Sequence, residues 1–262
     1  MSAASLVGMD IAYRRGARDA LAGASLAIWS GEIVALLGAN GSGKTTLLRI
    51  LMGFLAPAGG RVLLDGAPIE KLGRRAIARK IAYVAQNHAA PFPYLVRDVV
   101  ALGRLPHSGW RPGASAHEEP HVDEALRRLR ISHLADRPYT EISGGERQLA
   151  MLGRALAQGA EILVLDEPMT GLDYGAQLRL IALLRGLAAE ARGIVMTTHH
   201  PEHAHWASDR VAFLEKGRIA EQGPPDEVLT AAAIERLYGV KVDTLETDTG
   251  RRLFGPREHG SW

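Results

Sequence analysis

A glycine-rich segment, residues 38–45, constrains the fold of this chain more than any other part of the sequence. It reads GANGSGKT and therefore has the form G-x-x-x-x-G-K-[ST]. The apolar run 33–37 before it is short enough for a buried strand, and residues 46–51 after it have the apolar spacing of a helix. A strand, a glycine-rich loop and a helix in that order predict a phosphate-binding loop, and we call residues 38–45 the phosphate loop.

The residue types in the phosphate loop fit a nucleoside triphosphate. Glycines let the backbone approach phosphate oxygens and adopt conformations that a Cβ would forbid. The backbone N–H groups of the loop and the N-terminus of the next helix attract an anion. We expect Lys44 to reach the β- and γ-phosphates and the Thr45 hydroxyl to bind Mg²⁺. The nucleotide-binding residues expected here are Gly38, Asn40, Gly41, Ser42, Gly43, Lys44, Thr45 and Thr46.

The composition bounds the class of protein. The chain has 262 residues, of which 47% are hydrophobic and 23% charged, which is enough for one sizeable core with a subdomain. The formal net charge is +2 and no long Lys/Arg run is present, so nucleic acid is not an expected partner. The absence of cysteine excludes disulfides and thiolate chemistry. The first residues do not read as a signal peptide, and no run approaches the ~18 apolar residues of a membrane helix, so we expect any membrane role to require a partner.

Strand-like and helix-like segments alternate along most of the chain. This alternation predicts an α/β fold with a largely parallel sheet covered on both faces, preceded by an N-terminal β part in the first ~30 residues. After Gln86 the sequence pattern becomes helical, so residues 87–158 are expected to form an inserted helical subdomain. The expected nucleotide-binding core then consists of residues 1–86 and 159–240. Residues 241–262 form no clear element and are expected to be a tail.

The local patterns also suggest element boundaries. Residues 95–102, 122–134 and 177–189 have helical spacing, whereas residues 87–93 and 106–116 are expected to be loops. Asp226 is placed to cap a short helix after two prolines.

Two adjacent acids follow the apolar run 162–165. A strand would deliver Asp166 to the sheet edge, where its carboxylate can hold Mg²⁺ directly or through water. Glu167 is then placed to orient or deprotonate an attacking water. Acids at strand ends are common, but the phosphate loop upstream favours the catalytic interpretation.

A third motif, residues 142–148, reads ISGGERQ. It resembles the signature LSGGQ of ATP-binding-cassette (ABC) proteins, and we call it the signature segment. Ser143 offers a hydroxyl, while Gly144 and Gly145 allow close backbone approach at the start of a helix. The Ser-x-x-Glu pattern is also an ordinary capping box. Ile142 and Glu146 depart from the family pattern without removing the serine or the glycines.

The resemblance covers residues 5–240 and implies a P-loop ATPase fold that uses ATP and Mg²⁺. The resemblance also implies roles for further residues. Gln86 matches the glutamine that senses Mg²⁺ and the attacking water, and His199 matches the switch histidine at the γ-phosphate. Asp173 lies in a loop, residues 170–173, similar to the one that contacts the partner subunit. Tyr13 resembles the aromatic residue that stacks on adenine. The implied activity is hydrolysis of ATP to ADP and phosphate, coupled to transport.

The histidines that follow the strand ending near residue 198 permit an alternative interpretation as a metal cluster. His199 and His203 have a helical spacing, but Pro201 is expected to start a helix after His199 and so to break that face. No second set of ligands with metal-binding spacing is visible.

One chain carries one phosphate loop and one signature segment. In the family that it resembles, the signature serine of one copy completes the ATP site of another. The motif layout therefore predicts a homodimer with two identical sites that close over ATP and open after hydrolysis.

The segment after Gln86 is the part most specific to a branch of the family. Residues 93–107, which include VRDVVALGR, resemble importer ATPases for iron–siderophore, haem and cobalamin complexes. This resemblance implies that residues 87–108 receive an integral membrane permease, with a periplasmic or surface solute-binding protein acting indirectly. The chain would then sit on the cytoplasmic face of the inner membrane. A molybdate or tungstate importer, an exporter or release ATPase, and a soluble ABC protein that acts on nucleic acid remain the alternatives.

Overall fold

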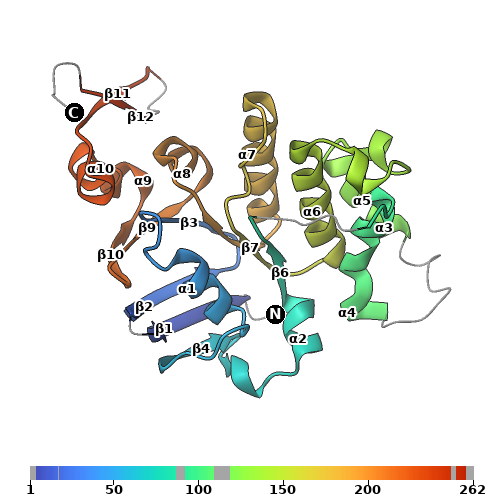
Figure 1. Cartoon of the computed structure of the whole chain (residues 1–262), viewed down its shortest axis with the longest axis horizontal. Coiled ribbons are helices and arrows are strands. Elements are labelled where there is room, and N and C mark those ends of the chain that lie inside the picture. Colours follow the sequence, from blue (N-terminus) through green and yellow to red (C-terminus); the bar gives the residue numbers. More distant parts are fainter. Residues whose placement is uncertain (1–3, 17, 87–91, 109–118, 249–251, 258–262) are drawn as a thin grey trace.

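The computed structural model describes residues 4–16, 18–86, 92–108, 119–248 and 252–257 (Figure 1). Most of the two expected loops, residues 87–91 and 109–116, lies outside these ranges. The strands are β1 (Ser5–Arg15), β2 (Arg18–Trp29), β3 (Ile33–Leu37), β4 (Gly59–Leu64), β5 (Ala67–Pro68), β6 (Ile81–Val84), β7 (Ile162–Leu165), β8 (Gly193–Thr197), β9 (Arg210–Glu215), β10 (Arg218–Gly223), β11 (Val242–Glu246) and β12 (Arg252–Pro256). The helices are α1 (Lys44–Leu51), α2 (Arg74–Lys80), α3 (Val96–Ala101), α4 (Leu105–Ser108), α5 (Glu119–Arg128), α6 (Gly144–Gln158), α7 (Tyr174–Ala189), α8 (Pro201–Ala207), α9 (Pro225–Val228) and α10 (Ala231–Tyr238).

The central sheet has the order β10-β9-β3-β8-β7-β6. Strands β9, β3, β8, β7 and β6 run parallel, and β10 joins the edge antiparallel to β9 through a tight turn. A second sheet, β2-β1-β4-β5, is antiparallel throughout. The predicted α/β fold with a largely parallel core sheet and an N-terminal antiparallel part is confirmed. The parallel order also brings the carboxyl ends of β3, β6, β7 and β8 to one edge, which is where ligands bind in such sheets.

Both faces of the central sheet are buried. All five residues of β3 are buried, and they alternate between two apolar clusters. Ile33, Ala35 and Leu37 face the cluster formed with α3 and α5–α8. Val34 and Leu36 face the cluster shared with α1 and the antiparallel sheet. This two-sided burial explains why the strand reads as a continuous apolar run rather than an alternating one.

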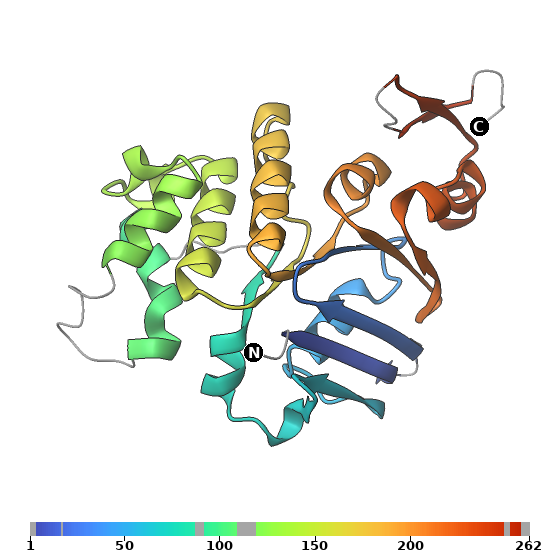
Figure 2. The same ribbon diagram turned by 180° about the vertical axis from the view of Figure 1, so that it is seen from behind.

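Helices α3, α5 and α6 pack together at one end of the molecule, and α7 stands between α6 and α8 (Figures 1 and 2). They belong to the segment 87–158 that the sequence marks as an inserted subdomain, and the boundaries of that subdomain stay a prediction. Within the described ranges, none of the helices has the length and apolar character needed to cross a lipid bilayer.

Three expected helix boundaries are wrong. Helix α7 begins at Tyr174 rather than at residue 177, because the Asp173 carboxylate caps it by accepting from the N–H of Ala176 at 2.7 Å. Helix α5 ends at Arg128 rather than at residue 134, and Arg130 then turns the backbone into the left-handed region (φ 58°). Asp226 lies inside α9, whose cap position is Pro224, and its carboxylate contacts His205 instead.

The expectation that residues 241–262 form no element is also wrong. Strands β11 and β12 pair antiparallel, with Val242 opposite Pro256, and form a C-terminal hairpin. Of its side chains, Val242 and Phe254 pack against the core, whereas Leu245 is exposed. Because the hairpin buries so little of its surface, its sequence lacks the apolar alternation that identifies a strand.

Candidate active site

The phosphate loop connects β3 to α1, and its backbone needs the glycines. Gly43 caps α1 with φ 108°, and a Cβ at that position would lie 2.6 Å from the Ala20 carbonyl oxygen. The Lys44 ammonium donates to the carbonyl oxygens of Gly38 at 2.6 Å and Ala39 at 3.2 Å. Burial lowers the pKa of Lys44, while the carboxylates of Glu167 and Asp166 act in the opposite direction. The loop therefore holds a cation at the start of a helix, where an anion is favoured.

Asp166 extends from the end of β7 toward the phosphate loop. Its Oδ2 accepts from the Thr45 hydroxyl at 2.9 Å, and its Oδ1 accepts from the Thr197 hydroxyl at 2.6 Å. The hydroxyl of Thr197 in turn accepts from the N–H of Glu167 at 2.8 Å. Asp166 is buried, so these bonds to neighbouring hydroxyls offset the cost of placing a carboxylate there.

Glu167 is the point at which side chains from several elements meet. Its Oε2 accepts from Gln86 Nε2 at 2.7 Å and from the Thr170 hydroxyl at 3.3 Å, and it lies 3.5 Å from His199 Nδ1. The Glu167 backbone has φ 50°, an uncommon value for a residue with a side chain, and such strain is often found at functional sites. The side chain of Glu167 is 13% exposed, so the cluster leaves little of it open to water.

A cavity of about 560 Å³ joins the phosphate loop to the acids. Its size fits a small-molecule ligand. The side chains and backbone that line it are those of Arg15, Ala20, Asn40, Gly41, Gly43, Lys44, Thr45, Thr46, Gln86, Asp166 and Glu167. The structure therefore brings most of the predicted nucleotide, metal and catalytic residues to one place.

Tyr13, Gly38, Ser42 and Asp173, also predicted to bind nucleotide, do not line this cavity. Tyr13 is half-buried on β1, where it packs against the apolar cluster, and it does not line the cavity. Ser42 lines a smaller neighbouring cavity, and its hydroxyl is buried without a hydrogen-bond partner among the described residues.

The signature segment is not part of this cavity in the same chain. Ser143 caps α6 by accepting from the N–H of Glu146, and the Glu146 carboxylate accepts from the N–H of Ser143 at 2.7 Å. Ser143 and Gly144 are exposed. Gly145 lies close to the loop that precedes Asp173, since a Cβ on Gly145 would be 2.9 Å from the Gly171 carbonyl oxygen. The capping box is thus present, and Ser143 does not line the cavity of its own chain.

The sequence interpretation missed Thr197, Arg15 and Ala20. Thr197 connects the two acids, and the signal for it was a polar residue at the end of the apolar strand β8. Arg15 and Ala20 line the cavity from the turn between β1 and β2, and no pattern in that polar turn distinguishes them.

The donors around Asp166 suit Mg²⁺, because a carboxylate, a threonine hydroxyl and an amide oxygen are the hard ligands that this ion prefers. The histidines around His199 were the alternative candidates for a metal site. In the ranges that the structure covers, no group of three or more His, Asp or Glu side chains has a geometry that could hold a metal ion.

The chain is similar to known proteins over nearly all of its length. The ABC transporter family profile matches residues 21–170. The hemin import ATP-binding protein of Nocardia farcinica is 39% identical over 252 residues, which are 94% of this chain and 86% of that protein. The ferric enterobactin transport ATP-binding protein of Escherichia coli is 37% identical over 242 residues, or 92% of this chain and 89% of that protein.

The fold is likewise similar to a solved structure. A metal-chelate type ABC transporter in an inward-facing conformation superposes with a TM-score of 0.83 at 28% identity. The match covers 98% of both chains, so it extends through the C-terminal part of this protein.

Proposed function

The chain belongs to the ABC transporter family, and we propose that it is the ATP-hydrolysing subunit of an importer for a metal chelate of the iron–siderophore, haem or cobalamin type. The observation that carries the proposal is the meeting of Gln86, Thr170 and His199 at one oxygen of Glu167, beside a phosphate loop. Relatives named for hemin import and ferric enterobactin transport favour an importer over an exporter.

Residues on one side of the cavity would bind the triphosphate. The backbone of the phosphate loop and Lys44 would hold the β- and γ-phosphates, and Tyr13 would stack on the adenine. Thr45, Asp166 and Gln86 would hold Mg²⁺, the first two being already 2.9 Å apart. When bound, the ion would neutralise charge that develops on the phosphate oxygens.

Residues on the opposite side would act on water. Glu167 would accept the proton of the attacking water as a general base. Gln86 and His199 hold its carboxylate from two directions, and Thr197 fixes its backbone through the N–H. Such positioning lets a carboxylate act without first reorganising.

A second copy of the chain would complete the site. Ser143 is exposed and does not line the cavity of its own chain, which supports a role at the nucleotide of another copy. In a symmetric homodimer, Ser143, Gly144 and Gly145 of one copy would close over the γ-phosphate bound to the other. Gly171 and Leu172 lie beside Gly145, and with Asp173 they would contact the partner copy.

The permease would dock at residues 87–108, of which residues 87–91 lie outside the described ranges. Large apolar side chains are exposed on the described part of this segment. They are Phe92 at 59%, Tyr94 at 57%, Leu102 at 44% and Leu105 at 40% exposure. Exposed apolar groups gathered on one short segment are typical of a protein interface. Docking there would place the chain on the cytoplasmic face of the inner membrane, with a periplasmic or surface solute-binding protein delivering the chelate.

The test is transport with the co-encoded permease reconstituted in liposomes. We expect ATP-dependent uptake of ferric siderophore, hemin or cobalamin, and no uptake when Lys44→Ala replaces the native chain. Uptake of molybdate instead of all three would move the chain to the sister branch. ATP-dependent export, or hydrolysis stimulated by nucleic acid and not by the permease, would contradict the proposal.

A further inference from the structure

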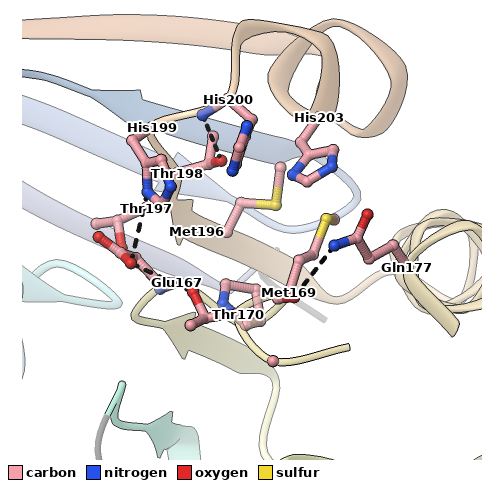
Figure 3. Close-up of a pocket in the computed structure, with 12 residues that line it drawn as sticks. Glu167, Met169, Thr170, Gln177, Met196, Thr197, Thr198, His199, His200 and His203 are labelled. Atoms are coloured by element: carbon pink, nitrogen blue, oxygen red, sulfur yellow. Dashed lines mark hydrogen bonds and ion pairs between the residues drawn. The ribbon is translucent and has the colours of Figure 1, made fainter. Parts of the chain in front are cut away.

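Helix α8 carries a buried histidine, His203. His203 is 8% exposed, and its Nδ1 has no hydrogen-bond partner among the described residues. It lines a cavity of about 190 Å³ together with the thioether side chains of Met169 and Met196 (Figure 3). Burial lowers the pKa of His203 to about 4, so its ring is neutral at pH 7. A buried polar atom without a partner costs stability, so the ring needs another explanation.

The ring belongs to a row of three imidazoles. Its centroid lies 4.7 Å from that of His200, which lies 4.2 Å from that of His199. Figure 3 shows the three rings side by side along the cavity, with His199 next to Glu167. We call His199, His200 and His203 the imidazole row. The planes of neighbouring rings are tilted by 42° and 50°, so each ring limits the directions in which the next can turn.

The backbone around the imidazole row is held at both ends of α8. The side-chain orientations of the three rings are therefore what the local structure leaves to be set. Pro201 starts α8 immediately after His200. Farther along, His205 Nε2 contacts Asp226 Oδ1 at 2.8 Å, and Glu202 Oε1 accepts from the N–H of Phe254 in the C-terminal hairpin at 3.4 Å. His199, however, is 46% exposed and contacts a cavity on one side. Without the row, its ring would have room to turn away from Glu167.

We propose that His203 is a positioning residue for ATP hydrolysis, which acts through His200 to hold the ring of His199 against Glu167. The inference rests on the proposed hydrolytic role of Glu167 and His199. It gives a role to a buried, neutral imidazole whose Nδ1 has no hydrogen-bond partner among the described residues. What His203 supplies is an aromatic ring against His200, and the proposal does not require its nitrogens.

Two replacements of His203 distinguish a need for an aromatic ring from a need for side-chain volume alone. His203→Phe keeps an aromatic face, and His203→Leu keeps the apolar volume without one. With the full-length chain, we expect His203→Leu to lower kcat for ATP on the order of tenfold with KM changed less than about twofold, since a small misplacement of a catalytic group is costly. His203→Phe should restore most of the rate. Both should melt at or above the native temperature, because each removes an unpaired polar atom. His121→Leu, at an exposed position on α5, is the control.

A double-mutant cycle with His199→Ala completes the test. If His203 acts through His199, His203→Leu should not lower the residual rate of His199→Ala any further. An unchanged kcat in His203→Leu, equal rates for the Leu and Phe variants, or a fall in melting temperature that parallels the loss of rate would each overturn the proposal. Uptake in liposomes tests the importer assignment. The rate ratios of the variants depend only on hydrolysis, so the two hypotheses can fail independently.

Discussion

Gln86 Nε2 donates to Glu167 Oε2 at 2.7 Å, although 81 positions separate the two residues in the sequence. The contact exists because β6 and β7 are parallel neighbours, so that Val84 pairs with Leu165 and both strands end at the same edge. An amide that holds the carboxylate from the β6 side leaves the other side for His199. The two acids after β7 are therefore not equivalent: Asp166 accepts from the hydroxyls of Thr45 and Thr197, and Glu167 contacts Gln86, Thr170 and His199.

Removing the amide should slow hydrolysis without weakening nucleotide binding. In Gln86→Ala, Glu167 loses its closest hydrogen-bond donor, so we expect kcat to fall by roughly 10- to 100-fold with little change in affinity for ATP. Phosphate release and fluorescent nucleotide binding measure the two quantities. A loss of affinity as large as the loss of rate would instead place Gln86 mainly in nucleotide binding.

Glu167→Gln should trap the chain before hydrolysis. The amide cannot accept a proton, so the rate should fall by roughly 10²–10⁴, the usual contribution of a general base. With ATP and Mg²⁺ at micromolar protein concentration, light scattering should then show a dimer that Ser143→Ala weakens. A variant that stays monomeric under these conditions would contradict the shared site, and near-native turnover would remove Glu167 from the role of base.

The local motifs could be predicted because their meaning depends on adjacent residues. The phosphate loop, the acids after β7 and the capping box at Ser143 each lie within a few consecutive positions. Thr197 could not be assigned in this way, since its role depends on β7 and β8 lying side by side. The C-terminal hairpin was missed for a related reason: its main support is a few contacts with α8 and α10, not an apolar pattern of its own.

Thr197→Val should damage the site through hydrogen bonding alone. Valine has the same shape, but it leaves the buried Asp166 Oδ1 and the N–H of Glu167 without the hydroxyl that joins them. We expect a loss of about 1–3 kcal/mol in the free energy of unfolding, measured by urea denaturation. Thr197→Ser keeps the hydroxyl and should lose less. Equal losses in the two variants would mean that packing, not hydrogen bonding, accounts for the effect.

Two glycine-to-alanine changes should have opposite effects. At Gly43, φ is 108° and a Cβ would lie 2.6 Å from a backbone oxygen, so Gly43→Ala should destabilise the chain and abolish ATP binding. At Gly186, inside α7, nothing lies within 4 Å of the Cβ position. Gly186→Ala should therefore stabilise the chain by about 0.5–1 kcal/mol with unchanged ATP affinity. Thermal melting with and without nucleotide distinguishes the two, and a destabilised Gly186→Ala would show that α7 is packed more tightly than the structure indicates.

The burial of His203 should make the chain sensitive to acid. Its pKa is lowered from 6.5 to about 4 in the folded state, so between these values the unfolded chain binds more protons than the folded one. The cost of charging His203 in the folded state is absent above pH 6.5, and the chain loses stability as the pH falls toward 4. At pH 5 the loss amounts to about 2 kcal/mol relative to pH 8, and it should be absent from His203→Leu. Urea denaturation of both chains at the two pH values gives the difference directly. Parallel curves for the two chains would contradict this prediction.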